Sequence, residues 1–149
     1  MTAELLHAEY LHLYGIYEGY NAQVLELKGW SVTIGLAALI GVYTTGASAS
    51  GRIGVVLAAL ASIPFWLIET FWKVFQTAGL SRINELELCA ANKFQGCQPM
   101  QAAASWRGAF EAGRYDLWMG TAFDWHVLLP HLVLLVGGLL LEWKCPPSK

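Results

Sequence analysis

Residues 30–47 read WSVTIGLAALIGVYTTGA, a run of eighteen residues without a charged side chain. About 20 mainly apolar residues are needed for a helix to cross a bilayer core of about 30 Å. Lys28 precedes this run and Arg52 follows it, so a cation flanks each of its ends. The run therefore predicts a membrane-spanning helix.

A second apolar stretch begins at Ile53 and reads IGVVLAALASIPFWLIETFW. It ends in Trp66, Phe71 and Trp72, and such aromatic residues are typical of a membrane–water interface. Between the two stretches, residues 48–52 read SASGR, which indicates a tight turn. We predict that the two stretches form an antiparallel helical hairpin.

Residues 125–143 read WHVLLPHLVLLVGGLLLEW and form a third apolar stretch with Trp at both ends. Pro130 has no backbone N–H, so it leaves the carbonyl of His126, four residues earlier, without its helical donor. We expect a kink there, or another group that satisfies this carbonyl. Three spans would place the two termini on opposite sides of the membrane.

The composition supports an all-α, multi-pass integral membrane protein. Of the 149 residues, 56% are hydrophobic and 13% are charged, whereas a soluble domain has about 25% charged residues. The mean hydropathy is +0.44. This apolar composition makes a lipid bilayer the expected partner. A net charge of −2 offers no basic surface, so we expect no nucleic acid among the partners.

Residues 1–29 carry apolar side chains at spacings of three and four, as in a heptad seam. The pattern predicts an amphipathic helix with an acidic opposite face. Its seam either packs on the rest of the chain or self-associates, and both alternatives stay open here. The seam consists of Leu6, Tyr10, Leu13, Tyr17, Tyr20, Val24 and Leu27.

Residues 77–124 are expected to form a small helical cap outside the bilayer. Helical sequence continues beyond the second span, residues 92–99 read NKFQGCQP and indicate a loop, and Met100 to about Ala112 is helix-permissive. The predicted parts are residues 1–29, an amphipathic helix; 30–76, the hairpin; 77–124, the cap; and 125–149, the third span with a short tail.

Two observations bear on orientation and give opposite answers. Counting Lys and Arg, the side with the N-terminus and the cap has six and the other side has three, which favours a cytoplasmic N-terminus in a bacterial inner membrane. Cys89 and Cys97 have a spacing that could close as a disulfide if the cap faced an oxidising space.

Ionisable residues in or near the apolar stretches are candidates for function, because they are costly in lipid. Glu69 and Lys73 stand at i and i+4 and can form a helical ion pair; alternatively, they line a pore or bind a partner. His126 and His131, with Asp124, could hold a metal, but a spacing of five suits hydrogen bonding to a neighbouring helix better.

Small residues recur at spacings of three and four in the first two spans, which lets helix backbones approach closely. They can serve packing within the chain or oligomerisation. The residues concerned are Gly35, Ala38, Gly41, Gly54, Ala58 and Ala61.

No G-x-S-x-G, H-E-x-x-H, C-x-x-C or P-loop motif occurs, so an enzyme is the less favoured class. The order of amphipathic helix, close-packed hairpin and helical continuation FWKVFQTAGLSRINELE resembles bacterial two-transmembrane effector modules of the SLATT kind over about residues 10–90. That resemblance implies an oligomeric effector that breaches the inner membrane in antiviral defence. The third span and the Trp-rich cap depart from that plan, and no functional residue is carried over.

We expect a non-enzymatic membrane protein that acts by helix-mediated assembly, as an oligomeric effector or pore. The alternative is an accessory subunit of a larger membrane complex, such as a respiratory, transport or metal-dependent assembly. A His-based metal-binding membrane protein is the third choice. No cofactor is predicted, with metal or haem left open.

Overall fold

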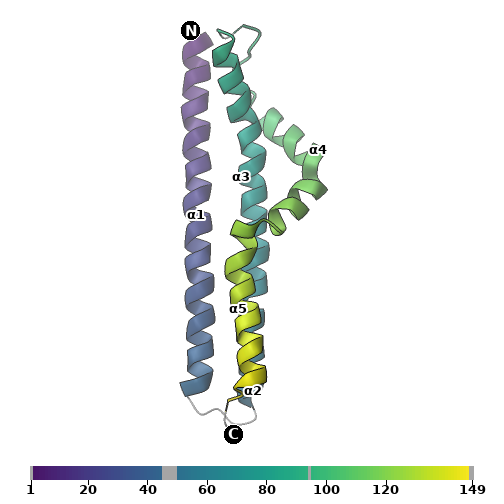
Figure 1. The fold of residues 1–149 in the computed structure, drawn as a ribbon. Coiled ribbons are helices and arrows are strands. Elements are labelled where there is room, and N and C mark those ends of the chain that lie inside the picture. The colour runs from purple at the N-terminus through teal and green to yellow at the C-terminus, as the bar shows by residue number, and fades with distance from the viewer. Residues whose placement is uncertain (1, 45–49, 94, 148–149) are drawn as a thin grey trace. The chain divides into compact units, whose positions relative to one another are not determined.

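The computed structural model describes residues 2–44, 50–93 and 95–147. Their helices are α1 (Thr2–Thr44), α2 (Ser50–Leu60), α3 (Ser62–Ala91), α4 (Ala102–Ala122) and α5 (Trp125–Lys144) (Figure 1). The described ranges contain no strand, so the all-α prediction is confirmed for them.

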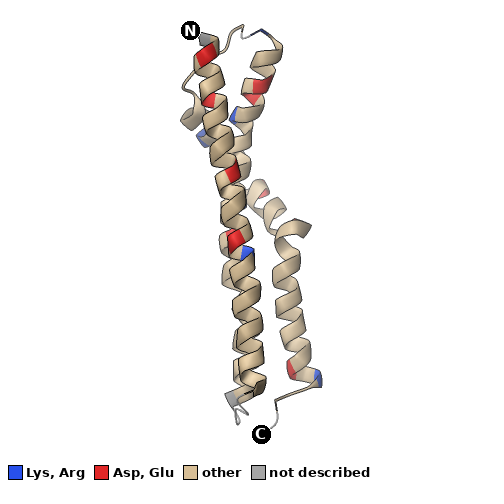
Figure 2. Ribbon diagram, turned by 90° about the vertical axis from the view of Figure 1, so that its left-hand side faces the viewer, with Lys and Arg blue, Asp and Glu red and all other residues tan. Residues whose placement is uncertain are grey.

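Three stretches are long and apolar enough to cross a membrane: Ala3–Thr44, Gly51–Ala91 and Trp125–Lys144. They contain the spans expected from the sequence, except for residues 45–47 of the first span, which lie outside the described residues. On α5 the charged residues lie only at the C-terminal end, as Figure 2 shows. The 43 residues of α1 extend over about 65 Å, twice the thickness of a bilayer core, so about half of that helix exceeds what one crossing needs.

The amphipathic segment and the first span form one helix. The predicted boundary between residues 29 and 30 falls inside α1, which continues through it. Gly29 stands at this point, and a glycine in a helix interior costs only about 1 kcal/mol relative to alanine. That penalty is too small to end a helix that packs on both sides of it.

The second span is interrupted at Ala61, between α2 and α3. Pro64 explains the interruption, because proline cannot donate to the carbonyl of Leu60 and its ring crowds that oxygen. The hydroxyl of Ser62 instead donates to the carbonyl of Ala59 at 2.8 Å. Of the turn predicted at residues 48–52, residues 48 and 49 lie outside the described residues, whereas residues 50–52 form the start of α2 instead of a turn.

The chain forms two compact units, each built from segments far apart in the sequence. Unit 1 comprises Met1–Val24 and Phe71–Thr121, and unit 2 comprises Leu25–Thr70 and Ala122–Lys149. This division cuts across the four parts expected from the sequence. The reason is that each unit contains those parts of the long helices that pack against each other.

In unit 1 the first part of α1 runs antiparallel to the last part of α3. Leu6 and Val24 of α1 are buried, as are Val74, Ile83 and Leu86 of α3. Helix α4 adds an aromatic stack, in which the Trp106 and Phe110 rings lie 5.1 Å apart and nearly parallel, and Phe75 of α3 stacks on Phe110. The helix expected to end near Ala112 continues to Ala122.

In unit 2, α5 lies beside α2, and the second part of α1 completes the packing (Figure 1). Leu39, Val55 and Ala58 form a buried cluster. Helix backbones come close at glycines: a Cβ added to Gly54 would lie 2.8 Å from Val42 Cγ2, and one added to Gly138 would lie 2.7 Å from Ala59 Cβ. This unit positions the candidate site.

Candidate functional site

The site begins at the N-terminal part of α5. Asp124 caps this helix, since its carboxylate accepts a hydrogen bond from the backbone N–H of His126 at 3.0 Å. One turn later, Pro130 leaves the carbonyl of His126 without its helical donor. Lys28 of α1 supplies the replacement, because its Nζ donates to His126 O at 2.8 Å. This is the additional donor that the sequence led us to expect.

Lys28 also pairs with a buried carboxylate. Its Nζ lies 3.1 Å from Glu69 Oε1, on α3. The Glu69 side chain has no exposed surface, whereas 22% of the Lys28 side chain is exposed. Glu69 Oε1 lies within ion-pair distance of Lys28 Nζ, but the two groups do not form a hydrogen bond. The pair therefore neutralises a carboxylate that would otherwise be buried alone.

The second oxygen of Glu69 is held by α5. His131 Nε2 lies 3.0 Å from Glu69 Oε2, and His131 Nδ1 lies 3.0 Å from Ser31 Oγ. A carboxylate beside Lys28 only accepts hydrogen bonds, so Nε2 of the imidazole carries the proton. At the other side of the ring, Nδ1 shares a hydrogen bond with the hydroxyl of Ser31, and a hydroxyl can serve as donor or acceptor there.

We call Lys28, Ser31, Glu69 and His131 the buried polar cluster. Glu69 is 0%, Ser31 2% and His131 3% exposed. The cluster joins α1, α3 and α5, and the ammonium group of Lys28 offsets the charge of the Glu69 carboxylate. Each polar side chain has a hydrogen-bond or ion-pair partner, which is what makes burial of such groups tolerable.

A serine, a histidine and a carboxylate in one chain of hydrogen bonds are also the residue types of a hydrolase triad. The nucleophile of a hydrolase must meet its substrate. Ser31 is 2% exposed and its hydroxyl is engaged with the imidazole. The geometry therefore suits a bond between helices rather than attack on a substrate.

Glu69 and Lys73 do not act as the helical pair that their spacing suggested. Glu69 is turned to Lys28 and His131, while Lys73 Nζ donates to Gln76 Oε1 at 2.7 Å. A spacing of four residues shows only that two side chains lie near each other on the same helix. A buried carboxylate instead takes the cation and donor offered by the helices packed against it.

The two histidines predicted as metal ligands bind different partners. His131 belongs to the buried polar cluster, whereas His126 bonds to Asp124 and Lys28 through its backbone N–H and carbonyl. Asp124 is occupied as the N-cap of α5. Among the described residues no group of three His, Cys, Asp or Glu side chains is placed to hold a metal ion.

The predicted packing glycines take different positions. Gly35 is buried and a Cβ added there would lie 3.1 Å from Leu134 Cδ1 of α5, in addition to the close approaches at Gly54 and Gly138. Ala58 is buried in the cluster that Ala38 flanks. Gly41 and Ala61 are half-buried.

The heptad seam contacts α3 within unit 1. Tyr10 Oη donates to Glu87 Oε1 at 3.0 Å, the carbonyl of Tyr17 accepts from Gln76 Nε2 at 3.1 Å, and the Tyr20 and Trp72 rings lie 5.4 Å apart. Leu6 and Val24 are buried, and Leu13 lines a cavity. Leu27 is half-buried in unit 2.

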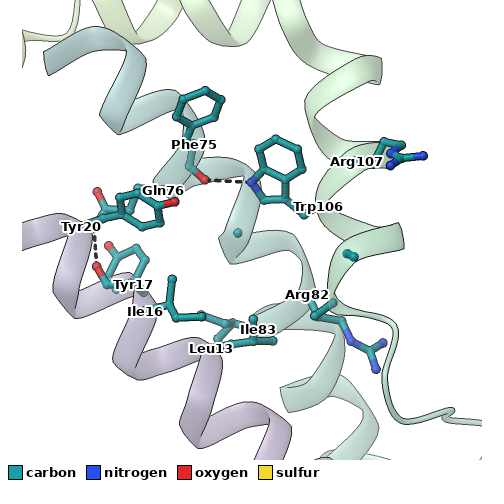
Figure 3. A pocket seen from close by; sticks show the side chains of 13 residues that line it. Leu13, Ile16, Tyr17, Tyr20, Phe75, Gln76, Arg82, Ile83, Trp106 and Arg107 are labelled. Carbon is teal, nitrogen blue, oxygen red and sulfur yellow. Dashed lines mark hydrogen bonds between the residues drawn. The ribbon is translucent and has the colours of Figure 1, made fainter. Parts of the chain in front are cut away.

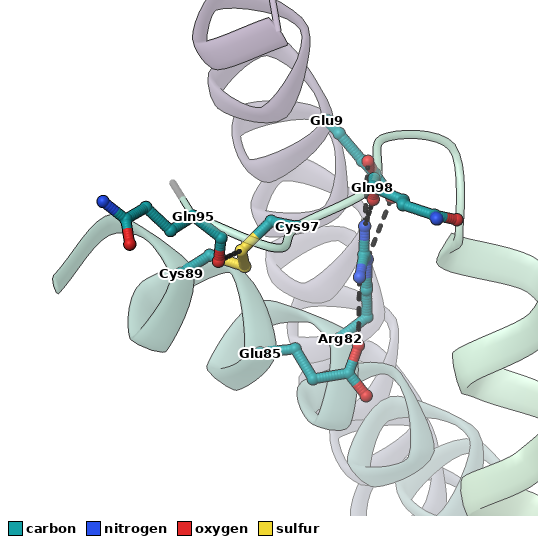
Figure 4. The surroundings of a disulfide bond; sticks show 7 residues. All are labelled: Glu9, Arg82, Glu85, Cys89, Gln95, Cys97 and Gln98. Carbon is teal, nitrogen blue, oxygen red and sulfur yellow. Dashed lines mark hydrogen bonds and ion pairs between the residues drawn. A yellow bond between two sulfur atoms is a disulfide. The ribbon is translucent and has the colours of Figure 1, made fainter. Parts of the chain in front are cut away.

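A second polar group closes the loop between α3 and α4 (Figure 4). The structure joins Cys89 and Cys97 by a disulfide. Beside it, the Arg82 guanidinium pairs with Glu9 at 3.1 Å and donates to the carbonyl of Gln98 at 2.7 Å. Glu9 also accepts from the backbone N–H groups of residues 100 and 101, so this loop is fixed to α1.

Sequence reasoning missed Ser31 and treated Lys28 only as a flanking charge. A signal for both was present, because residues 28, 31 and 35 follow each other at spacings of three and four and so share a helix face with the packing glycine. What the sequence does not show is which carboxylate and imidazole meet that face.

Comparison with known proteins found no matching family model, no matching curated protein and no matching solved structure.

Proposed function

We propose that the chain is a non-enzymatic integral membrane protein that acts by helix-mediated assembly, through the outward face of α1 in unit 1. The observation that carries the proposal is a group of exposed small residues on that face, opposite the buried Leu6 and Val24. The group consists of Ala8, Gly15, Gly19 and Ala22.

Two of these residues are glycines four positions apart, a spacing that lets another helix approach closely. A Cβ added to Gly15 or Gly19 would meet no described atom within 4 Å. Alanine would therefore fit at either position and would favour the helix by about 1 kcal/mol each. Packing within the chain does not explain why glycine stands there, whereas contact with a further helix does.

Large apolar side chains border this face, together with the exposed acidic side chain of Glu18. Leu11 is 56% exposed and Tyr14 is 47% exposed. Exposed apolar surface of this kind marks sites of protein or membrane interaction. A second copy of the chain is the preferred occupant, because a two-fold axis would set the same flat face against itself.

Two alternatives predict different purified complexes. An accessory subunit of a larger membrane complex would be extracted with foreign chains on the same face. A His-based metal protein would carry stoichiometric metal, for which His126, His131 and Asp124 would have to be brought together. A pore or a defence effector requires several copies, since three spans enclose no channel.

For orientation, we propose that the N-terminus and the loop of residues 92–101 face an oxidising compartment, such as the periplasmic side of a bacterial inner membrane. The Cys89–Cys97 disulfide supports this placement, because disulfides are rare in the reducing cytosol. The Lys and Arg count favours the opposite orientation.

The assembly proposal is tested by the oligomeric state of the chain in nanodiscs and of its Gly15→Leu/Gly19→Leu variant. Gly108→Leu is the matched control, because Gly108 is exposed and open on α4. Loss of the oligomer in the double variant alone supports the proposal. A monomeric wild-type chain without partners contradicts it.

A further inference from the structure

Unit 1 contains a cavity of about 450 Å³ between α1, α3 and α4 (Figure 3). This volume lies within the range of about 300–1,000 Å³ that is usual for small-molecule sites. Its walls are mainly apolar and aromatic, with Ile16 and Tyr17 from α1, Phe75 and Ile83 from α3, and Trp106 from α4.

The cavity exists because small residues line parts of α3 and α4. Gly79 and Ala103 both face it, and a Cβ added to Gly79 would meet no described atom within 4 Å. Helices that met only one another would gain from larger side chains at these positions. The space is therefore open where close packing would be easy to achieve.

Three of the polar side chains along the walls, Trp106, Gln76 and Arg82, are already engaged. Trp106 Nε1 donates to the carbonyl of Phe75 at 3.3 Å, and Gln76 binds Tyr17 O and Lys73 Nζ through its two ends (Figure 3). Arg82 is ion-paired with Glu9 and Glu85. An occupant of the interior consequently finds apolar surface and few unsatisfied donors or acceptors.

Arg107 differs from these groups. It is exposed at the edge of the cavity, and its guanidinium points outward from α4, away from the cavity interior (Figure 3). Among the described residues, no ion pair includes Arg107. The cavity thus has an apolar interior, and one cation without an ion pair among the described residues stands at its edge, where its side chain must turn toward the opening to meet a bound molecule.

We propose that this cavity binds the hydrocarbon chain of a single-chain anionic amphiphile, a long-chain fatty acid, with its carboxylate at Arg107. The apolar walls accept the chain, and the exposed guanidinium complements the charge of the head group. A free aliphatic chain without a charged head would use the same walls but not Arg107.

The probe is a palmitic acid that carries a photoactivatable diazirine, added to the full-length chain in phosphatidylcholine nanodiscs. After irradiation, mass spectrometry locates the adducts on peptides. We expect adducts on residues of the cavity wall, and an excess of unlabelled palmitate suppresses them. Adducts confined to residues 30–44, 53–70 and 125–144, or adducts that palmitate does not suppress, would overturn the proposal without recourse to any variant.

Two neighbouring alanines of α4 provide a matched pair of variants. Ala103 lines the cavity, whereas the exposed Ala104 does not belong to its lining. Ala103→Leu should abolish the adducts and Ala104→Leu should retain them. Equal labelling of both variants would contradict binding in the cavity.

The role of the charge is read from Arg107→Gln. This substitution removes the exposed ion pair between Arg107 and the carboxylate of palmitate. The concentration of palmitate that suppresses half of the labelling should therefore rise about threefold in the variant. The corresponding diazirine hexadecanol should label wild type and Arg107→Gln equally. An unchanged palmitate response in Arg107→Gln would refute the assignment of the head group. Adduct positions are read independently of oligomeric state, so this result and the assembly proposal can fail separately.

Discussion

Lys28 Nζ donates a hydrogen bond to the backbone carbonyl of His126 at 2.8 Å. This carbonyl has no helical donor because Pro130 lacks a backbone N–H. A side chain of α1 therefore supplies the hydrogen bond that is missing from the backbone of α5. The same ammonium group lies 3.1 Å from Glu69 Oε1. A single lysine therefore satisfies two groups that would each be costly in an apolar environment.

Removal of the Lys28 charge should destabilise the protein. In Lys28→Met, Glu69 would remain buried without its cation and His126 O without its donor. We expect a loss of about 2–4 kcal/mol, less than for a fully buried pair because 22% of the Lys28 side chain is exposed. The measurement is the midpoint of thermal unfolding in nanodiscs, which should fall by about 5–10 °C.

A double variant separates the ion pair from general damage. Lys28→Met/Glu69→Gln removes both charges and should recover part of the loss, since a neutral amide is less costly to bury than an unpaired carboxylate. If the two single variants and the double variant show additive losses, the ion pair between Lys28 and Glu69 is not coupled as described.

The hydroxyl of Ser31 should matter because it shares a hydrogen bond with a buried imidazole. Ser31→Ala leaves His131 Nδ1 without a partner and should cost about 1–2 kcal/mol of unfolding free energy. Thr33 is exposed on the same helix, so Thr33→Ala is a matched loss of one hydroxyl and should stay within about 0.5 kcal/mol of wild type. Equal effects of the two substitutions would remove the support for the assigned hydrogen bond.

Adjacent glycines of α5 test the close approach to α2. A Cβ on Gly138 would lie 2.7 Å from Ala59 Cβ and 3.4 Å from its Cα, while one on Gly137 would meet no described atom within 4 Å. Gly138→Ala should therefore destabilise by about 1–3 kcal/mol through overpacking. Gly137→Ala should be neutral or stabilising by up to about 1 kcal/mol. Unfolding midpoints in that order are expected, and the reverse order would argue against the α2–α5 contact.

The orientation can be measured by reporter fusions in a bacterial host. With the Cys89–Cys97 disulfide closed, a fluorescent protein fused after Lys149 should fold in the cytoplasm and a periplasm-dependent phosphatase at the N-terminus should be active. Cys145 is the exposed free thiol and should react with maleimide from the cytoplasmic side. An active phosphatase at the C-terminus would instead support the orientation given by the Lys and Arg count.

Hydropathy predicts the three candidate spans well because lipid imposes a simple rule of length and composition. It does not predict that α1 continues through Gly29, since that depends on packing that outweighs a weak helix former. The interruption at Ala61 was predictable from Pro64, whose effect on the preceding turn is local. The two compact units depend on which halves of the long helices pair, and no local pattern carries that information.

The sequence predicts that certain buried polar groups need partners, but it does not predict which residues form the buried polar cluster. Pro130 indicates that the carbonyl of His126 requires a donor, and Glu69 in an apolar stretch requires a cation. Lys73 was the nearest cation in sequence, whereas Lys28 is the one in space. Tertiary pairing across helices decides between such candidates, and sequence spacing reports only on one helix at a time.

Whether the chain assembles through the outward face of α1 is decided by the mass and subunit composition of the complex after mild extraction into nanodiscs. We predict a defined homo-oligomer for wild type and Gly108→Leu, and a monomer for Gly15→Leu/Gly19→Leu. A wild-type chain that is monomeric and free of partner chains, or an oligomer that the double substitution leaves intact, would contradict the claim.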